Sequence, residues 1–324
     1  MKKRIQSLDG WRGVSILFVL AGHLFPLGPS NWKMNSAIAA TGMVIFFILS
    51  GFLITNILFK KQNIVSFLIR RFMRIIPLAW IVLAITFIFI GADKNTYISH
   101  FLSYANWEPM TLTLATSHYW SLCVEMQFYV LIAFLVFVLK DKAFMLLPVM
   151  SLLVTGYRYF NEVEKAINTY YRIDEILAGC ILALLYNQNS KTIKKFFSFL
   201  NPIILFPILV LSAHPNGGFL NYLRPYIAML IVGSTIFSQE KTWWQNLLNK
   251  NKFLLYTASV SYALYVIHGG LRYSWLGTGE TMIVYLKRPL LLAVTFLLAH
   301  LSTFYYEKYW IQFGKRLSNN INLK

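Results

Sequence analysis

The chain has few acidic residues and very few cysteines for its length. Of its 324 residues only 12 are Asp or Glu, and charged residues of all kinds make up 13%. Globular domains carry about a quarter charged residues, so this composition excludes an ordinary soluble domain. The two cysteines, Cys123 and Cys180, fall at or within apolar segments. They are too few for a disulfide framework, and we interpret both as small apolar side chains.

The sequence motifs of several common enzyme classes are also absent. The chain contains no P-loop, no GxGxxG sequence and no GxSxG nucleophile elbow. It also lacks the HExxH pattern and paired CxxC motifs, so we predict no metal site. Any chemistry must therefore come from polar residues scattered through the apolar segments.

Long apolar runs dominate the sequence. Hydrophobic residues make up 57% of the chain, which predicts an all-α integral membrane protein. The runs are near the length needed to cross a bilayer and predict about ten transmembrane helices, of which 143–157 and 173–187 are the weakest. These helices are predicted at residues 14–29, 37–58, 75–91, 122–139, 143–157, 173–187, 197–213, 222–238, 253–270 and 289–306. An even count brings both termini to the same side of the membrane.

The positive charge of the chain is best explained by membrane orientation. A net charge of +18 is also found in nucleic-acid-binding proteins. In membrane proteins, however, Lys and Arg collect on the cytoplasmic side, and most of them do so here if the N-terminus is cytoplasmic. We therefore expect cytoplasmic termini and no nucleic-acid partner. No long polar linker or internal repeat is present, so we predict a single membrane domain over residues 1–324, with no cleavable signal peptide.

Two polar residues of interest, Arg12 and His23, lie just before and within the first predicted helix. On one helix they lie about 16 Å apart along the axis, with the arginine near the inner face and the histidine near mid-bilayer. An ionisable residue inside a membrane span is a candidate functional residue, because its burial in hydrocarbon is costly. The alternative is a histidine that is satisfied by a neighbouring helix.

A cluster of arginines follows the second predicted helix. Residues 59–74 have the pattern of a short amphipathic helix in the inner membrane interface, and they include Arg70, Arg71 and Arg74. Guanidinium groups suit phosphate, although such arginines also serve as helix anchors that attract anionic lipid. On the second helix, Ser50 and Gly51 permit the close approach of either a ligand or another helix.

Further polar residues are predicted toward the outer side. Glu125 lies just inside a span, where it is costly without a partner, and Trp120 and Tyr129 flank it. An interfacial aromatic belt explains the two aromatic residues but leaves the glutamate unexplained. Arg172 with Asp174, and Tyr265 with His268, repeat this pattern. The alternatives are an Arg172–Asp174 pair, and a histidine placed favourably near a helix C-terminus.

Taken together, these motifs resemble those of a known family. They are residues 8–13 (Leu-Asp-Gly-Trp-Arg-Gly) with His23, residues 46–54 with Ser50 and Gly51, residues 70–77, Trp120 with Glu125 and Tyr129, Arg172 with Asp174 and Gly179, residues 261–268, and Glu307. Their order and spacing resemble the bacterial acyltransferase 3 family, the membrane O-acyltransferases of O-antigen, exopolysaccharide and antibiotic tailoring. One departure is Met126, where the family often has a second acidic residue. The hydrolase-like extracytoplasmic domain of some members is not expected here.

The resemblance implies a function and roles for the residues. It implies a ten-helix protein of the bacterial cytoplasmic (inner) membrane that moves an acyl group, most often acetyl from acetyl-CoA, to a sugar hydroxyl of a surface glycan such as O-antigen or exopolysaccharide. The expected catalytic residues are His23, Arg12 and Glu125, with His23 acting as base or as acyl carrier. The expected donor contacts are Arg70, Arg71, Arg74, Ser50 and Gly51. The expected acceptor contacts are Trp120, Tyr129, Arg172, Asp174, Tyr265 and His268. The alternative function is a transporter or flippase of a lipid-linked saccharide, since intramembrane Arg, Glu and His also line transport pathways.

Overall fold

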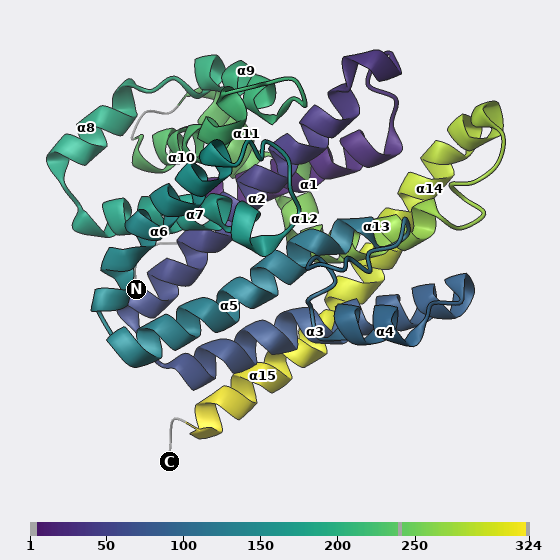
Figure 1. The fold of residues 1–324 in the computed structure, drawn as a ribbon, viewed down its shortest axis with the longest axis horizontal. Helices are drawn as coiled ribbons and strands as arrows, with labels where there is room; N and C mark the ends of the chain where they lie inside the picture. The colour runs from purple at the N-terminus through teal and green to yellow at the C-terminus, as the bar shows by residue number, and fades with distance from the viewer. Residues whose placement is uncertain (1–4, 239–241, 322–324) are drawn as a thin grey trace. The chain divides into compact units, whose positions relative to one another are not determined.

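The computed structural model describes residues 5–238 and 242–321, and within these ranges it contains helices and no strand (Figure 1). The predicted all-α class is therefore confirmed. The chain forms two compact units, which are described separately. Unit 1 comprises Met1–Lys60, Asp141–Ala166 and Tyr170–Ser259, and unit 2 comprises Lys61–Lys140, Ile167–Thr169 and Val260–Lys324.

Unit 1 is built around one long apolar helix. Its helices are α1 (Gln6–Leu24), α2 (Met34–Lys60), α6 (Lys142–Phe160), α7 (Thr169–Gln188), α8 (Lys191–Phe199), α9 (Pro202–Ala213), α10 (Leu220–Phe237), α11 (Trp243–Lys250) and α12 (Lys252–Ser259), with a short 3-10 turn at Ser30–Trp32. The 27 residues of α2 contain no charge before Lys60, and most of the apolar stretch of this helix is buried. Its side chains form the core together with residues of α1, α7 and α10. A helix this apolar on all sides is expected at the centre of a bundle.

Two glycines set the crossing of α2 and α7. A Cβ atom on Gly51 would lie 2.0 Å from the carbonyl oxygen of Ile176, and one on Gly179 would lie 2.2 Å from that of Ile48. Only glycine allows the two backbones to approach this closely, as in small-residue contacts between membrane helices. The crossing holds the N-terminal turns of α7, which carry all three of its charged residues, against the core of unit 1.

Unit 2 is organised around α3 (Ile64–Ile90), against which α5, α13 and α15 pack. Its other helices are α4 (Lys94–Phe101), α5 (Trp120–Leu139), α13 (Ser261–Arg272), α14 (Thr281–Leu301), a π-helix at Ser302–Glu307, and α15 (Lys308–Ile321), with a 3-10 turn at Ser117–Tyr119. The side chain of Asn63 caps α3 by accepting from the Ser66 amide at 2.9 Å. Figure 1 shows the C-terminal helix α15 lying beside α3.

The helices agree with the predicted spans in part. In the described ranges, five segments are long and apolar enough to cross a membrane, and the bent pair α8–α9 makes a sixth if counted as one span. These five segments are Ser30–Lys60, Ile64–Ile90, Ser117–Leu139, Lys142–Phe160 and Thr281–Ile321. The count of ten spans, the cytoplasmic termini and the single domain over residues 1–324 stay predictions.

Three predicted segments differ in continuity from the observed helices. The predicted helix at 197–213 bends by 76° between α8 and α9, where Pro202 begins the second helix. The predicted helix at 253–270 is broken at Val260. The amphipathic segment at 59–74 is not a separate helix, because α3 runs without a break from Ile64 to Ile90. The arginines of this segment therefore lie within the first three turns of a long apolar helix.

Candidate functional site

Arg12 and His23 lie on the same side of α1. Eleven residues are about three helical turns, so the two side chains leave the helix in nearly the same direction. Both are half-buried, and Asp9 lies 3.6 Å from the Arg12 guanidinium. The helix ends at Leu24, so His23 stands in the last turn and not in the helix interior as predicted. A histidine there is favoured by the helix dipole.

Hydrogen bonds fix the rotation of α1 about its axis. Trp11 donates its indole N–H to the hydroxyl of Thr235 in α10 at 2.9 Å, and Ser15 donates to the carbonyl of Gly42 in α2 at 2.8 Å. Gly10 and Gly13 meet the backbones of α11 and α12 where no Cβ would fit. The residues of the 8–13 motif that surround Arg12 thus serve helix packing, and they hold Arg12 and His23 on the less covered side of the helix.

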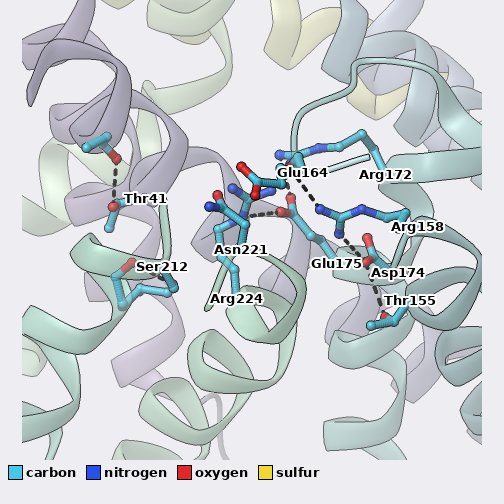
Figure 2. A network of polar contacts seen from close by, with 12 residues as sticks. Thr41, Thr155, Arg158, Glu164, Arg172, Asp174, Glu175, Ser212, Asn221 and Arg224 are labelled. Atoms are coloured by element: carbon cyan, nitrogen blue, oxygen red, sulfur yellow. Dashed lines mark hydrogen bonds and ion pairs between the residues drawn. The ribbon is translucent and has the colours of Figure 1, made fainter. Parts of the chain in front are cut away.

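A network of buried charges lies where the C-terminal end of α6 meets the N-terminal ends of α7 and α10 in unit 1 (Figure 2). Arg158 donates to Asp174 at 2.6 Å, Arg172 donates to Glu175 at 3.0 Å, and Arg224 donates to Glu175 at 2.8 Å. These five side chains are between 0% and 5% exposed. We call them the buried charge cluster. The ion pairs of the cluster join Arg172 to Glu175 and Asp174 to Arg158, whereas an Arg172–Asp174 pair was the alternative considered from the sequence.

Three members of the buried charge cluster were missed from the sequence. Arg158 follows one predicted span and Arg224 lies at the start of another, where both have the pattern of helix-end anchors. Glu175 was given no role of its own. The signal available in the sequence was the number of charged residues at the ends of these predicted spans. Charged residues that are buried in or near a membrane span usually have a function or a partner. Only the folded chain brings residues 158, 175 and 224 together.

In unit 2, the arginines of α3 differ in their surroundings. Arg70 donates through Nε to Ser318 at 2.7 Å and through Nη2 to Asn319 at 2.9 Å, so it attaches α15 to α3. Arg71 lies over the ring of Tyr129, with its guanidinium carbon 5.8 Å from the ring centroid. The Tyr129 hydroxyl donates to Glu125 at 2.6 Å. Arg71, Tyr129 and Glu125 therefore form one connected group, which the sequence had divided between the two sides of the membrane.

Arg74 interacts with a second buried carboxylate, that of Glu307. Glu307 closes the π-helix, accepts from Thr303 at 2.8 Å and interacts electrostatically with Arg74. The Tyr262 hydroxyl donates to the carbonyl of Ile75 at 2.5 Å, close to Pro77 in α3. A π-helical turn is often found at functional sites, and this one turns a carboxylate toward the arginine-bearing helix.

A second polar group in unit 2 surrounds Tyr265. Its hydroxyl donates to the carbonyl of His118 and lies 2.5 Å from the Ser121 hydroxyl. The rings of His118 and His268 are 4.7 Å apart between centroids. His118 was assigned no role from the sequence. It fits there because residue 269 is glycine: an added Cβ would lie 1.9 Å from the His118 ring. Trp120 begins α5 next to this group and is half-buried.

Comparison with known families identifies the chain. The family model for the acyltransferase domain of the acyltransferase 3 family matches residues 5–314. The chain belongs to this acyltransferase family. The match spans both compact units and contains every residue of the sites described above except Ser318 and Asn319.

Several relatives of this acyltransferase are named for O-acetyltransfer. It is 28% identical over 225 residues to the peptidoglycan O-acetyltransferase OatA of Listeria monocytogenes, covering 58% of this chain and 35% of that protein. It is 26% identical over 316 residues to a provisionally named O-acetyltransferase of Staphylococcus aureus (strain COL), covering 82% of this chain and 50% of that protein. The chain thus spans half or less of the length of these relatives. No solved structure gives a significant match.

Proposed function

We propose that this protein transfers an acyl group, acetyl in the simplest case, from acyl-CoA to a sugar hydroxyl of a bacterial surface glycan. The observation that carries the proposal is Arg12 and His23 on one side of α1 in a chain of the acyltransferase family. The names of its relatives make peptidoglycan the first acceptor to test, with O-antigen and exopolysaccharide as the other surface glycans. The proposed location is the cytoplasmic membrane, crossed several times.

The chemistry of this transfer needs a base and a leaving group. In the proposed step, His23 takes the proton of the acceptor hydroxyl as its oxygen attacks the thioester carbonyl. The carbon–sulfur bond then breaks, and the CoA thiolate leaves and takes the proton back from the imidazolium. If His23 instead carries the acyl group, its ring nitrogen attacks the thioester carbonyl and the CoA thiolate leaves. The acceptor hydroxyl then attacks the acyl-imidazole, its proton passes to the thiolate, and the imidazole leaves. Arg12 supplies positive charge to the same side of α1.

Donor binding is proposed for the arginines of α3. Guanidinium groups bind phosphate through paired hydrogen bonds, and the CoA moiety carries several phosphate charges. Arg71 and Arg74 are the better candidates, because Arg70 is already engaged by α15. Glu125 then acts through Tyr129 on the position of Arg71. Ser50 and Gly51 stay proposed donor contacts, although the packing of α2 on α7 already accounts for Gly51.

Acceptor binding is proposed for aromatic and charged residues. In unit 2, Trp120, Tyr129, Tyr265 and His268 supply rings and hydroxyl groups of the kind that bind sugars. In unit 1, Arg172 and Asp174 are the proposed contacts, and both belong to the buried charge cluster.

The test is acetyl transfer by the purified protein in lipid nanodiscs. Labelled acetyl-CoA is supplied with peptidoglycan fragments or with exopolysaccharide, and label on the glycan is measured. We expect transfer by the wild type and none by His23→Ala, with the protein still folded by size-exclusion chromatography. His300→Ala is the matched control, because the His300 ring lies against Phe304, 4.6 Å between centroids, and His300 is given no role. Normal transfer by His23→Ala would refute the assignment.

The same preparation tests the alternative of a saccharide transporter. If no glycan is labelled but a fluorescent lipid-linked saccharide crosses vesicle membranes only when the protein is present, the transporter function is favoured. Intramembrane Arg, Glu and His are compatible with that function as well.

A further inference from the structure

The charges of the buried charge cluster do not balance. Arg158 and Asp174 form a one-to-one pair, in which the guanidinium also donates to the carbonyls of Val163 and Glu164. By contrast, Arg172 and Arg224 share a single carboxylate, Glu175, which accepts from one arginine at each oxygen. The triad of Arg172, Glu175 and Arg224 therefore has two cations and one anion in a buried position.

Arg224 has a donor that is left over. Nη2 of Arg224 is buried and has no hydrogen-bond partner among the residues that the structure describes. The whole residue is only 3% exposed, so solvent does not easily reach this donor. Two cations that share one carboxylate, together with an unused charged donor, destabilise a low-dielectric interior. A folded protein keeps such an arrangement most readily where a ligand supplies the missing anion.

The triad also lies close to the ends of its helices. Arg172 and Glu175 are in the first two turns of α7, and Arg224 is in the second turn of α10. The residues that precede them, Tyr170 and Phe219, are 44% and 60% exposed. In Figure 2, Glu164 from the loop after α6 lies over the triad; in the part of the chain that the structure describes, its half-buried side chain makes no ion pair. The helix ends that carry the triad therefore adjoin exposed residues of unit 1.

We propose that Arg224, with Arg172, binds an anionic group of the acceptor, either a carboxylate on the sugar or the phosphate of a lipid-linked saccharide. This inference rests on the proposed acyl transfer and adds that the preferred acceptor is acidic. Planar guanidinium groups recognise both anions through the same paired hydrogen bonds. Glu164 opposes the ligand, since its carboxylate places negative charge beside the site.

The experiment compares acetyl transfer to three acceptors that share one sugar backbone. One acceptor is neutral, one carries a carboxylate, and one is neutral except for a polyprenyl diphosphate. For the wild type, we expect a higher kcat/KM with one of the acidic acceptors than with the neutral one, and that acceptor identifies the anion. The acidic-to-neutral ratio is the kcat/KM for the preferred acidic acceptor divided by that for the neutral one. Arg224→Gln should lower this ratio about tenfold or more, mainly through the KM for the acidic acceptor, because a charge-assisted hydrogen bond is lost. Glu164→Gln should raise it.

Arg158→Gln is the matched control. Arg158 is as buried as Arg224, but all its donors are used within the protein, so its loss should reduce the amount of folded protein without changing the acidic-to-neutral ratio. If Arg224→Gln does not fold, Glu164→Gln still decides. Equal transfer to acidic and neutral acceptors by the wild type, or an unchanged ratio in both Arg224→Gln and Glu164→Gln, would overturn the inference. No transfer to any acceptor would instead refute the proposed function.

Discussion

The substitution Gly51→Ala tests whether this glycine serves helix packing or ligand binding. In a helix interior, alanine normally stabilises by about 0.5–1 kcal/mol relative to glycine. At Gly51, however, the new Cβ would lie 2.0 Å from the Ile176 carbonyl oxygen, where real contacts are almost never below 3.0 Å. The backbones of α2 and α7 must therefore separate by about 1 Å, because a carbonyl in a helix cannot turn aside like a flexible side chain. Overpacking of this kind costs about 1–3 kcal/mol.

The measurement is thermal unfolding of the purified protein in detergent, together with the KM for acetyl-CoA. Gly156→Ala in α6 is the control, because an added Cβ there meets nothing within 4 Å. We expect Gly51→Ala to lower Tm by several degrees and Gly156→Ala to leave it unchanged or raise it. Activity should fall together with the folded fraction, because the separation of α2 from α7 displaces the turns of α7 that carry Arg172 and Glu175. A Gly51→Ala protein with the stability of Gly156→Ala would refute the packing argument, and a selective rise in KM would point to donor contact.

Three other contacts give separate predictions. Asp174→Asn should lower the free energy of unfolding by about 3–5 kcal/mol, because it leaves Arg158 buried without its counter-ion. Adding Arg158→Met should recover part of this loss. Equal stability of the single and double variants in thermal unfolding would contradict this prediction. Arg70→Ala should expose α15 to limited proteolysis with less effect on the KM for acetyl-CoA than Arg71→Ala, and unchanged cleavage would exclude the anchoring role. Asp93 caps α4, and its hydrogen bonds from Thr96 hold the pKa of its carboxyl below the usual value. This stabilisation is present above the unfolded pKa of about 3.9 and is lost as pH falls through the lower folded value, so amide exchange in the first turn of α4 should accelerate at low pH in the wild type but not in Asp93→Ala.

The parts of the site that lie within one helix could be predicted from the sequence. The spacing of Arg12 and His23 already puts them on one side of a helix, because the helical repeat is fixed by backbone geometry. The end of that helix was less predictable. The apolar run continues past Leu24, but Pro26, Gly28 and Pro29 stop the helix before the run ends. In α3 the opposite happened, since Pro77 lies inside a helix that continues through it.

By itself, the sequence determined that this is a helical, apolar protein with the motifs of a membrane acyltransferase, because composition and short-range spacing are properties of the chain alone. The tertiary structure decided which polar groups meet. Glu175 takes both Arg172 and Arg224, and Tyr129 joins Glu125 to Arg71, across separations that no local pattern encodes. A buried charge must find a partner wherever packing brings one, so its partner depends on how the helices cross and not on its neighbours in sequence.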